Sequence, residues 1–125
     1  MEQRAGVTKM MNQKPDKWGY LVIWEFRVRP GMEKRFEEVY GSEGDWVRLF
    51  LRDKEFIGTE LIRNLKGFGG YLTLDFWMSQ TGYESFRARH AADYEVLDAS
   101  CEALTESERE LGSYVRASVP WLGTS

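Results

Sequence analysis

The chain has 125 residues, of which 42% are hydrophobic and 14% aromatic, and its formal net charge is −3. This length and composition predict one domain with a substantial apolar core. The small negative charge and the lack of a basic stripe argue against nucleic-acid binding, and no apolar run approaches the ~18 residues of a membrane span. Cys101 is the single cysteine, which excludes an internal disulfide and predicts a cytoplasmic protein in a reducing compartment.

Composition along the chain divides it into a leader, a domain and a tail. Residues 1–17 are polar and aperiodic, which is typical of a flexible N-terminal leader, and they lack the apolar centre of a signal peptide. We expect the folded domain to span residues 18–119. Residues 120–125 then form a short C-terminal tail.

The first predicted strand, residues 20–28, is apolar on both faces. One face carries Tyr20, Val22, Trp24, Phe26 and Val28, and the other carries Leu21 and Ile23 beside Glu25 and Arg27. A strand with two apolar faces is covered on both sides. A small domain has helices for only one of them, so we predict that a second copy covers the other and that the protein is a homodimer through its sheet face.

The following elements alternate between helix and strand. Apolar spacing predicts a helix from Met32 to Tyr40, with Gly41 after it, and a short helix that Asp45 caps. Two strands, residues 56–64 and 71–79, flank the glycine-rich turn 66–70. A helix that Ser79 or Thr81 caps then runs to His90.

After His90 we predict a further helical run that ends at Gly112. Its apolar stripe is interrupted at Glu108, and residues 105–108 resemble a second capping box. Residues 113–119 then predict a short last strand. The order β-α-β-β-α-β predicts an α+β, ferredoxin-like fold, in which a four-stranded antiparallel sheet carries helices on one face.

Three segments resemble the antibiotic biosynthesis monooxygenase domain: residues 28–31 (VRPG), 56–61 (FIGTEL) and 77–86 (WMSQTGYESF). The resemblance runs from about residue 20 to residue 115. It implies a dimeric α/β barrel, in which two sheets pack face to face. The family includes oxygenases that need no cofactor and act on aromatic polyketides, as well as haem-degrading enzymes.

The resemblance also implies site residues. Some oxygenases of the family use an Asn, a Trp and a Tyr in a pocket between sheet and helices. Trp77 resembles that Trp and Tyr83 the Tyr, whereas Thr73 stands where the Asn is expected. Haem-degrading members carry an Asn in the first strand, which this chain lacks, and a His closer to the Trp than His90 is. Haem binding is therefore the weakest interpretation.

Residue chemistry adds a candidate base. Asp75 shares a predicted strand face with Trp77, and a buried carboxylate needs a partner or a raised pKa. We predict Trp77, Tyr83 and Asp75 as catalytic residues, and Thr73, Tyr71, His90 and Trp24 as substrate-binding residues. Each also has a purely structural interpretation: packed aromatics, an ion pair or edge residue for Asp75, and a helix-end partner for His90. No His or Cys stands at metal-ligand spacing from His90, so we predict no metal site.

Two functions remain open. The first is a cofactor-independent monooxygenase that acts on a small planar aromatic, of the quinol or polyketide type. In that case the protein contributes a dry cavity, orientation and stabilisation of an anion. The second is a dimeric module that binds a small apolar or aromatic ligand without turnover. In both cases we expect no cofactor.

Overall fold

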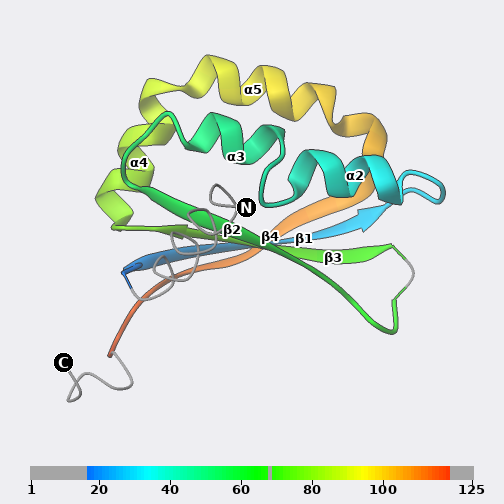
Figure 1. Ribbon diagram of the computed structural model, residues 1–125, viewed down its shortest axis with the longest axis horizontal. Coiled ribbons are helices and arrows are strands. Elements are labelled where there is room, and N and C mark those ends of the chain that lie inside the picture. The colour runs from blue at the N-terminus through cyan, green and yellow to red at the C-terminus, as the bar shows by residue number, and fades with distance from the viewer. Residues whose placement is uncertain (1–16, 68, 119–125) are drawn as a thin grey trace, which may run out of the picture.

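Four antiparallel strands form one sheet, and helices α2 to α5 cover one of its faces (Figure 1). The computed structural model describes residues 17–67 and 69–118. The elements in chain order are β1 (Tyr20–Val28), α2 (Glu33–Tyr40), α3 (Asp45–Phe50), β2 (Phe56–Arg63), β3 (Gly70–Trp77), α4 (Gln80–Arg89), α5 (Ala91–Ser100), the 3₁₀ helix η2 (Glu102–Leu104) and β4 (Thr105–Val115). The strand order β2-β3-β1-β4 confirms the predicted ferredoxin-like fold.

The two central strands explain why the sheet has one buried face. In β3, burial alternates strictly, and Tyr71, Thr73, Asp75 and Trp77 point to the helices. Strand β1 pairs with β3 in antiparallel register, so that Trp24 lies opposite Thr73 and Val22 opposite Asp75. Successive side chains of these strands therefore point alternately to the helix-covered face and to the open face of the sheet, as the alternation in the sequence predicts.

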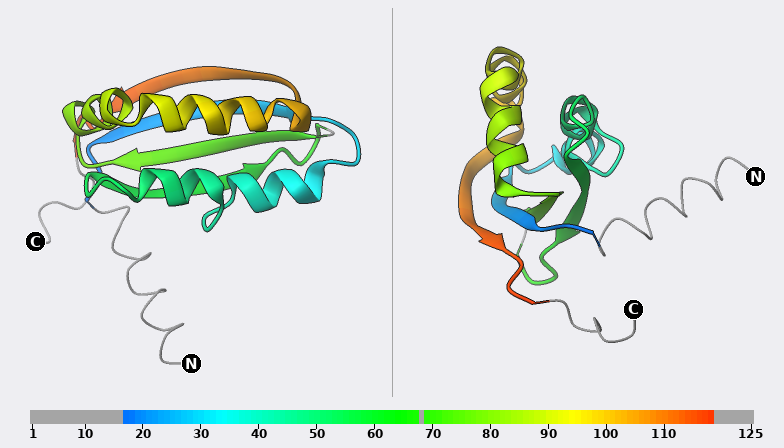
Figure 2. Two further views of the ribbon diagram at one scale, coloured as in Figure 1. Left: turned by 90° about the horizontal axis from the view of Figure 1, so that it is seen from above. Right: turned by 90° about the vertical axis from the view of Figure 1, so that its left-hand side faces the viewer.

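The helices lie on the sheet as two rows, α2 with α3 and α4 with α5 (Figure 2). Aromatic rings fill much of the space beneath them. Phe36 is fully buried and packs against Tyr40, Phe26 and Tyr71 with ring centroids 4.2, 5.3 and 4.9 Å away. None of the described helices is long and apolar enough to cross a membrane.

Local signals were correct at several boundaries. Ser79 is the N-cap of α4, and its hydroxyl accepts a hydrogen bond from the Gly82 amide at 3.0 Å. Gly69 has a φ of +71° in the β2–β3 turn, as a glycine-rich hairpin predicts. Two details differ: Gly44 rather than Asp45 precedes α3, and Gly41 ends α2 in an extended conformation.

The prediction for the last strand was wrong. Strand β4 begins at Thr105, so residues 105–112 are strand and not helix. It pairs with β1 along its whole length, from Val28 opposite Thr105 to Tyr20 opposite Val115. This long ladder outweighs the local helix propensity of the Glu-rich segment, because strand formation depends on pairing more than on intrinsic preference. Val119, the predicted end of the strand, lies outside the described residues.

The opposite face of the sheet carries no helix among the described residues. Ile23 of β1 lies opposite Leu74 of β3, and both are only partly buried. Ile62 is 42% exposed on this face. Glu25 and Arg109 also lie opposite each other on this face, where the guanidinium Nε donates to the carboxylate at 2.7 Å.

Replacing Phe36 with Ala tests the aromatic core. We expect the free energy of unfolding to fall by about 3–5 kcal/mol, because a large cavity opens in a closely packed cluster. Urea titration followed by circular dichroism measures the loss. Leu65→Ala is the control, since Leu65 is 95% exposed and its removal should change stability by less than about 0.5 kcal/mol. Equal effects of the two substitutions would contradict this account of the core.

Candidate functional site

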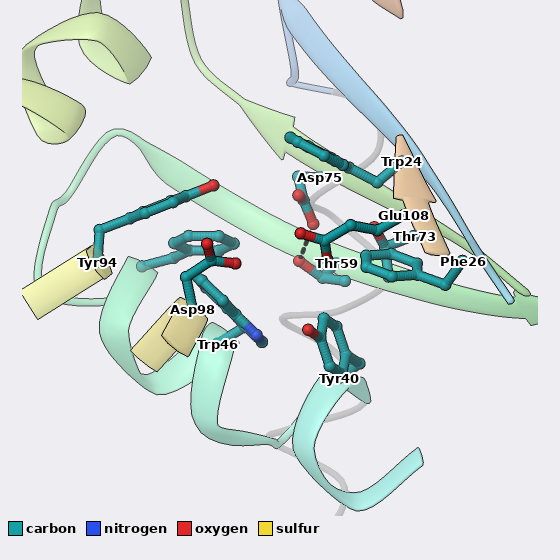
Figure 3. A pocket seen from close by; sticks show the side chains of 11 residues that line it. Trp24, Phe26, Tyr40, Trp46, Thr59, Thr73, Asp75, Tyr94, Asp98 and Glu108 are labelled. Carbon is teal, nitrogen blue, oxygen red and sulfur yellow. Dashed lines mark hydrogen bonds between the residues drawn. The ribbon is translucent and has the colours of Figure 1, made fainter. Parts of the chain in front are cut away.

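A cavity lies between the helix-covered face of the sheet and the helices (Figure 3). All four strands contribute to its wall, together with α2, α3 and α5. Its lining residues are Trp24, Phe26, Tyr40, Trp46, Phe50, Thr59, Thr73, Asp75, Tyr94, Asp98 and Glu108. Its volume is about 40 Å³, which admits ordered water and is far below the ~300 Å³ of a typical ligand site. A ring-sized ligand therefore requires some lining side chains to move.

Asp75 is the polar group at the floor of this cavity. It occupies an inward-facing position of β3, where it is buried. Thr59 lies directly opposite on β2, and its hydroxyl donates to Asp75 Oδ1 at 2.7 Å. The sheet register therefore holds the carboxyl group in place (Figure 3).

Burial raises the pKa of Asp75 from 3.8 to about 7, and the hydrogen bond from Thr59 opposes part of this rise. Desolvation penalises the charged form of a carboxyl group, whereas a donor to the carboxylate favours it. A group with this pKa is present in both protonation states near neutral pH. It can therefore take a proton from a ligand and return it.

The aromatic side chains of the cavity wall offer ring faces and hydrogen-bond donors to a ligand. Burial raises the pKa values of Tyr40 and Tyr94 above the ordinary tyrosine value, so both hydroxyls stay protonated at neutral pH. Trp46 is only 8% exposed, and its indole Nε1–H makes no hydrogen bond of normal geometry among the described residues, although it lies close enough to the Tyr40 hydroxyl to oppose the rise in the pKa of that group. The Trp77 indole N–H is likewise buried without a partner among these residues. Of the two, Trp46 belongs to the cavity wall.

The structure brings three of the predicted site residues together and leaves four outside. Asp75, Thr73 and Trp24 line the cavity. Trp77, Tyr83, Tyr71 and His90 are not among its lining residues. In the described conformation these four residues would not touch a ligand that occupies this cavity.

Trp77 is fully buried among aromatic rings. Its ring centroid lies 5.1 Å from that of Phe56 and 5.2 Å from that of Tyr83. Tyr83 is half-buried, burial raises its pKa, and its hydroxyl accepts a hydrogen bond from Arg87 at 2.9 Å. Both residues form part of the core that supports the end of β3.

Tyr71 and His90 lie at other places in the fold. The Tyr71 hydroxyl donates to Glu37 on α2 at 2.5 Å. His90 stands at the junction of α4 and α5, with its ring centroid 5.0 Å from that of Phe86. Among the described residues, no group of three or more His, Cys, Asp or Glu is placed to hold a metal ion.

Sequence reasoning missed most of the cavity wall. Tyr94 belonged to the predicted helical stripe, but nothing in that stripe distinguishes a cavity residue from a core residue. Glu108 was assigned to a helix. Had residues 105–115 been interpreted as a strand, the period of two would have placed Glu108 and Glu110 on the face of Phe26 and Trp24, which lie opposite them.

Comparison with solved structures identifies the fold. SnoaB, a cofactor-independent oxygenase from Streptomyces nogalater, matches with a TM-score of 0.64 at 17% identity, over 82% of this chain and 98% of that chain. The chain has the fold of the antibiotic biosynthesis monooxygenases. A putative antibiotic biosynthesis monooxygenase from Bacillus cereus matches with a TM-score of 0.57 at 13% identity, over 81% of this chain and 95% of that chain. No protein-family model and no curated protein matches the sequence.

A second kind of structure with this fold has no stated activity. A NIPSNAP family protein of unknown function from Agrobacterium tumefaciens matches with a TM-score of 0.56 at 19% identity, over 82% of this chain and 93% of that chain. These likenesses concern the fold, because sites with different chemistry occur on one fold. The chemistry of this chain has to be inferred from its own cavity.

The titration of Asp75 can be measured directly. We expect the carboxyl carbon signal of Asp75 to titrate with a midpoint near pH 7 in NMR spectra, because burial raises its pKa to about 7. Thr59→Val removes the donor that favours the carboxylate, so the midpoint should move to higher pH. A midpoint near 4 in the wild-type protein would contradict the buried position of this group.

The same shift predicts how stability depends on pH. The pKa of Asp75 is higher in the folded chain than in the unfolded chain, so its ionisation disfavours folding. This cost is absent below about pH 4, grows as pH rises, and is complete above about pH 7. Relative to the wild type, Asp75→Asn should therefore gain stability between about pH 4 and pH 8, by roughly 4 kcal/mol at most. Urea unfolding at several pH values measures the difference, and a constant difference would contradict the prediction.

Proposed function

We propose that the protein is a cofactor-independent monooxygenase for a small planar aromatic substrate of the quinol type. The observation that carries this proposal is the Asp75 carboxyl group, buried in an aromatic-lined cavity with a pKa of about 7. The fold shared with SnoaB, an oxygenase that needs no cofactor, supports it. The small volume of the cavity favours a single ring over a fused polyketide.

In this proposal Asp75 starts the reaction as a general base. It takes the proton of a ring hydroxyl group, which leaves an anion whose negative charge extends onto the neighbouring ring carbons. The anion transfers one electron to molecular oxygen, and the radical pair joins to form a bond between oxygen and one of these carbons. The peroxide then takes the proton back from Asp75. Loss of water, with the one hydrogen on that carbon, leaves a carbonyl group, so quinol and oxygen give a hydroxyquinone and water.

The lining residues would assist this chemistry through orientation and charge stabilisation. The rings of Trp24 and Tyr40 offer apolar faces to a planar substrate. The Trp46 indole N–H offers a donor to the oxygen on which negative charge develops, and a donor in a dry site stabilises such charge strongly. In the described conformation Trp77 would act indirectly, by supporting β3 beneath Asp75.

Oxygen uptake tests the proposal. A panel of single-ring hydroquinones is supplied to the wild type, Asp75→Asn and Glu60→Gln, and oxygen is followed with an electrode. We expect uptake by the wild type and a fall in kcat of at least about a hundredfold in Asp75→Asn, because a general base contributes that much. Glu60 is exposed on β2, so Glu60→Gln should retain activity. No uptake by the wild type across the panel would overturn the proposal.

Binding without turnover is the second candidate. The observation that favours it is that Thr73 occupies the position where the resemblance implies an Asn, while Trp77 is packed away from the cavity. Under this alternative, quinols would quench the fluorescence of Trp24 and Trp46 without consuming oxygen. Quenching together with oxygen uptake would exclude it.

We also propose that the protein forms a homodimer through the open face of its sheet. Ile23 and Leu74 lie opposite each other at the middle of this face, and a partner sheet would bury them. Size-exclusion chromatography with light scattering should give a dimer mass for the wild type and a monomer mass for Leu74→Lys. Leu65→Lys, in the exposed β2–β3 turn, should remain dimeric. A monomeric wild type would overturn this proposal.

A further inference from the structure

Negative charge gathers at the cavity without a matching positive charge. Three of its lining residues are carboxylic acids, namely Asp75, Asp98 and Glu108, and none is Lys, Arg or His. Within residues 17–67 and 69–118, the ion pairs of the structure use none of these three groups. Glu108 is an exposed residue at the edge of the cavity, where partial desolvation and then the neighbouring Asp98 and Glu102 raise its pKa. An acidic pocket of this kind gains from a cation that enters it.

The arginines close to this region have partners other than the three cavity acids. Arg109 follows Glu108 on β4 but points to the open face of the sheet, where it pairs with Glu25. Arg87 stacks on the Tyr94 ring at 3.9 Å from its centroid and donates to the Tyr83 hydroxyl. It is not a lining residue of the cavity. The chain thus leaves the positive charge to be supplied by a ligand.

The rest of the wall fits an organic cation better than a metal ion. Trp24, Tyr40 and Trp46 line the same space, and the faces of such rings attract ammonium groups. Among the described residues, no cluster of three or more potential metal ligands is present. The acids come from three different elements, β3, α5 and β4, so they surround the space rather than converge on one point.

Trp46 adds a polar donor to the cavity wall, beside the Tyr40 hydroxyl. Its indole N–H is buried with no partner among the described residues, and the residue is only 8% exposed. A cation alone cannot satisfy this donor, whereas a phenolic oxygen can accept from it. This donor is independent of the acidic groups, and a ligand with an oxygen as well as a positive charge would engage both.

We infer that the cavity binds a phenol or quinol that bears a protonated amine, with the ring oxygen toward Trp46 and the ammonium group toward Asp98 and Glu108. This names the class of substrate for the proposed function, and it rests on that function only in placing the ligand in the same cavity. The same carboxylates should repel an anionic aromatic acid and weaken its binding.

Three para-substituted phenols of different charge test this inference, and two of them, tyramine and 4-propylphenol, have the same shape. Tyramine carries an ammonium group, 4-propylphenol is neutral, and 3-(4-hydroxyphenyl)propanoate carries a carboxylate. Their affinities are measured under nitrogen by calorimetry and by quenching of tryptophan fluorescence. We expect tyramine to bind at least about tenfold more tightly than 4-propylphenol, and the carboxylate to bind most weakly.

Single substitutions test which side chains cause the preference for the ammonium probe. Glu108→Gln and Asp98→Asn should each lower the affinity for tyramine several-fold and leave that for 4-propylphenol unchanged, which also shows that the variants are folded. Glu95→Gln removes the same charge from an exposed position of α5 and should change neither affinity. Trp46→Phe should weaken both phenols alike, because it removes the shared donor.

Equal affinities for tyramine and 4-propylphenol would overturn the inference, as would a failure of all three probes to bind. A tyramine preference that survives in both carboxamide variants would also overturn it. None of these measurements needs turnover. A protein that binds tyramine selectively but consumes no oxygen would therefore overturn the oxygenase proposal and leave this inference standing.

Discussion

A buried carboxyl group on the helix-covered face of the sheet is the constraint around which the site is built. Asp75 sits between Thr73 and Trp77 in the inward positions of β3, where desolvation raises its pKa to about 7. A polar group in such a place costs stability unless it is compensated, and the single hydrogen bond from Thr59 compensates only part of it. Residues that are unfavourable for folding occur most often at functional sites. The buried carboxyl group of Asp75 is such a residue, which makes it the main candidate for a functional role.

The fold supplies what this group needs. The antiparallel register places Thr59 of β2 opposite Asp75, and the aromatic cluster around Trp77 and Phe50 holds the end of β3 against the helices. Helices α2, α3 and α5 then close over the carboxyl group with rings rather than with charged side chains, apart from Asp98 at the wall. Rigid elements thus position the reactive group, while the cavity stays largely apolar.

Charge separates the two faces of the sheet. On the open face, Glu25 and Arg109 neutralise each other within an apolar surface that a second copy can cover. On the helix-covered face, Glu108 of the same strand β4 forms no ion pair with another described residue, and desolvation followed by the charges of Asp98 and Glu102 raises its pKa. These two neighbouring residues of β4 therefore lie on opposite faces of the sheet: Arg109 on the open face, and Glu108 on the face that lines the cavity.

The sequence by itself determined the order of elements, the strand β1 and the strand face that Asp75 shares with Trp77, because these depend on periodicity and capping within short segments. It did not determine β4, since Glu-rich residues 105–112 become a strand only through their ladder with β1. It also did not distinguish Trp77, which packs in the core, from Trp46, which lines the cavity, because both are aromatic residues with apolar neighbours. Only the tertiary structure decided that distinction, since a cavity exists where several distant segments meet and fail to fill the space between them.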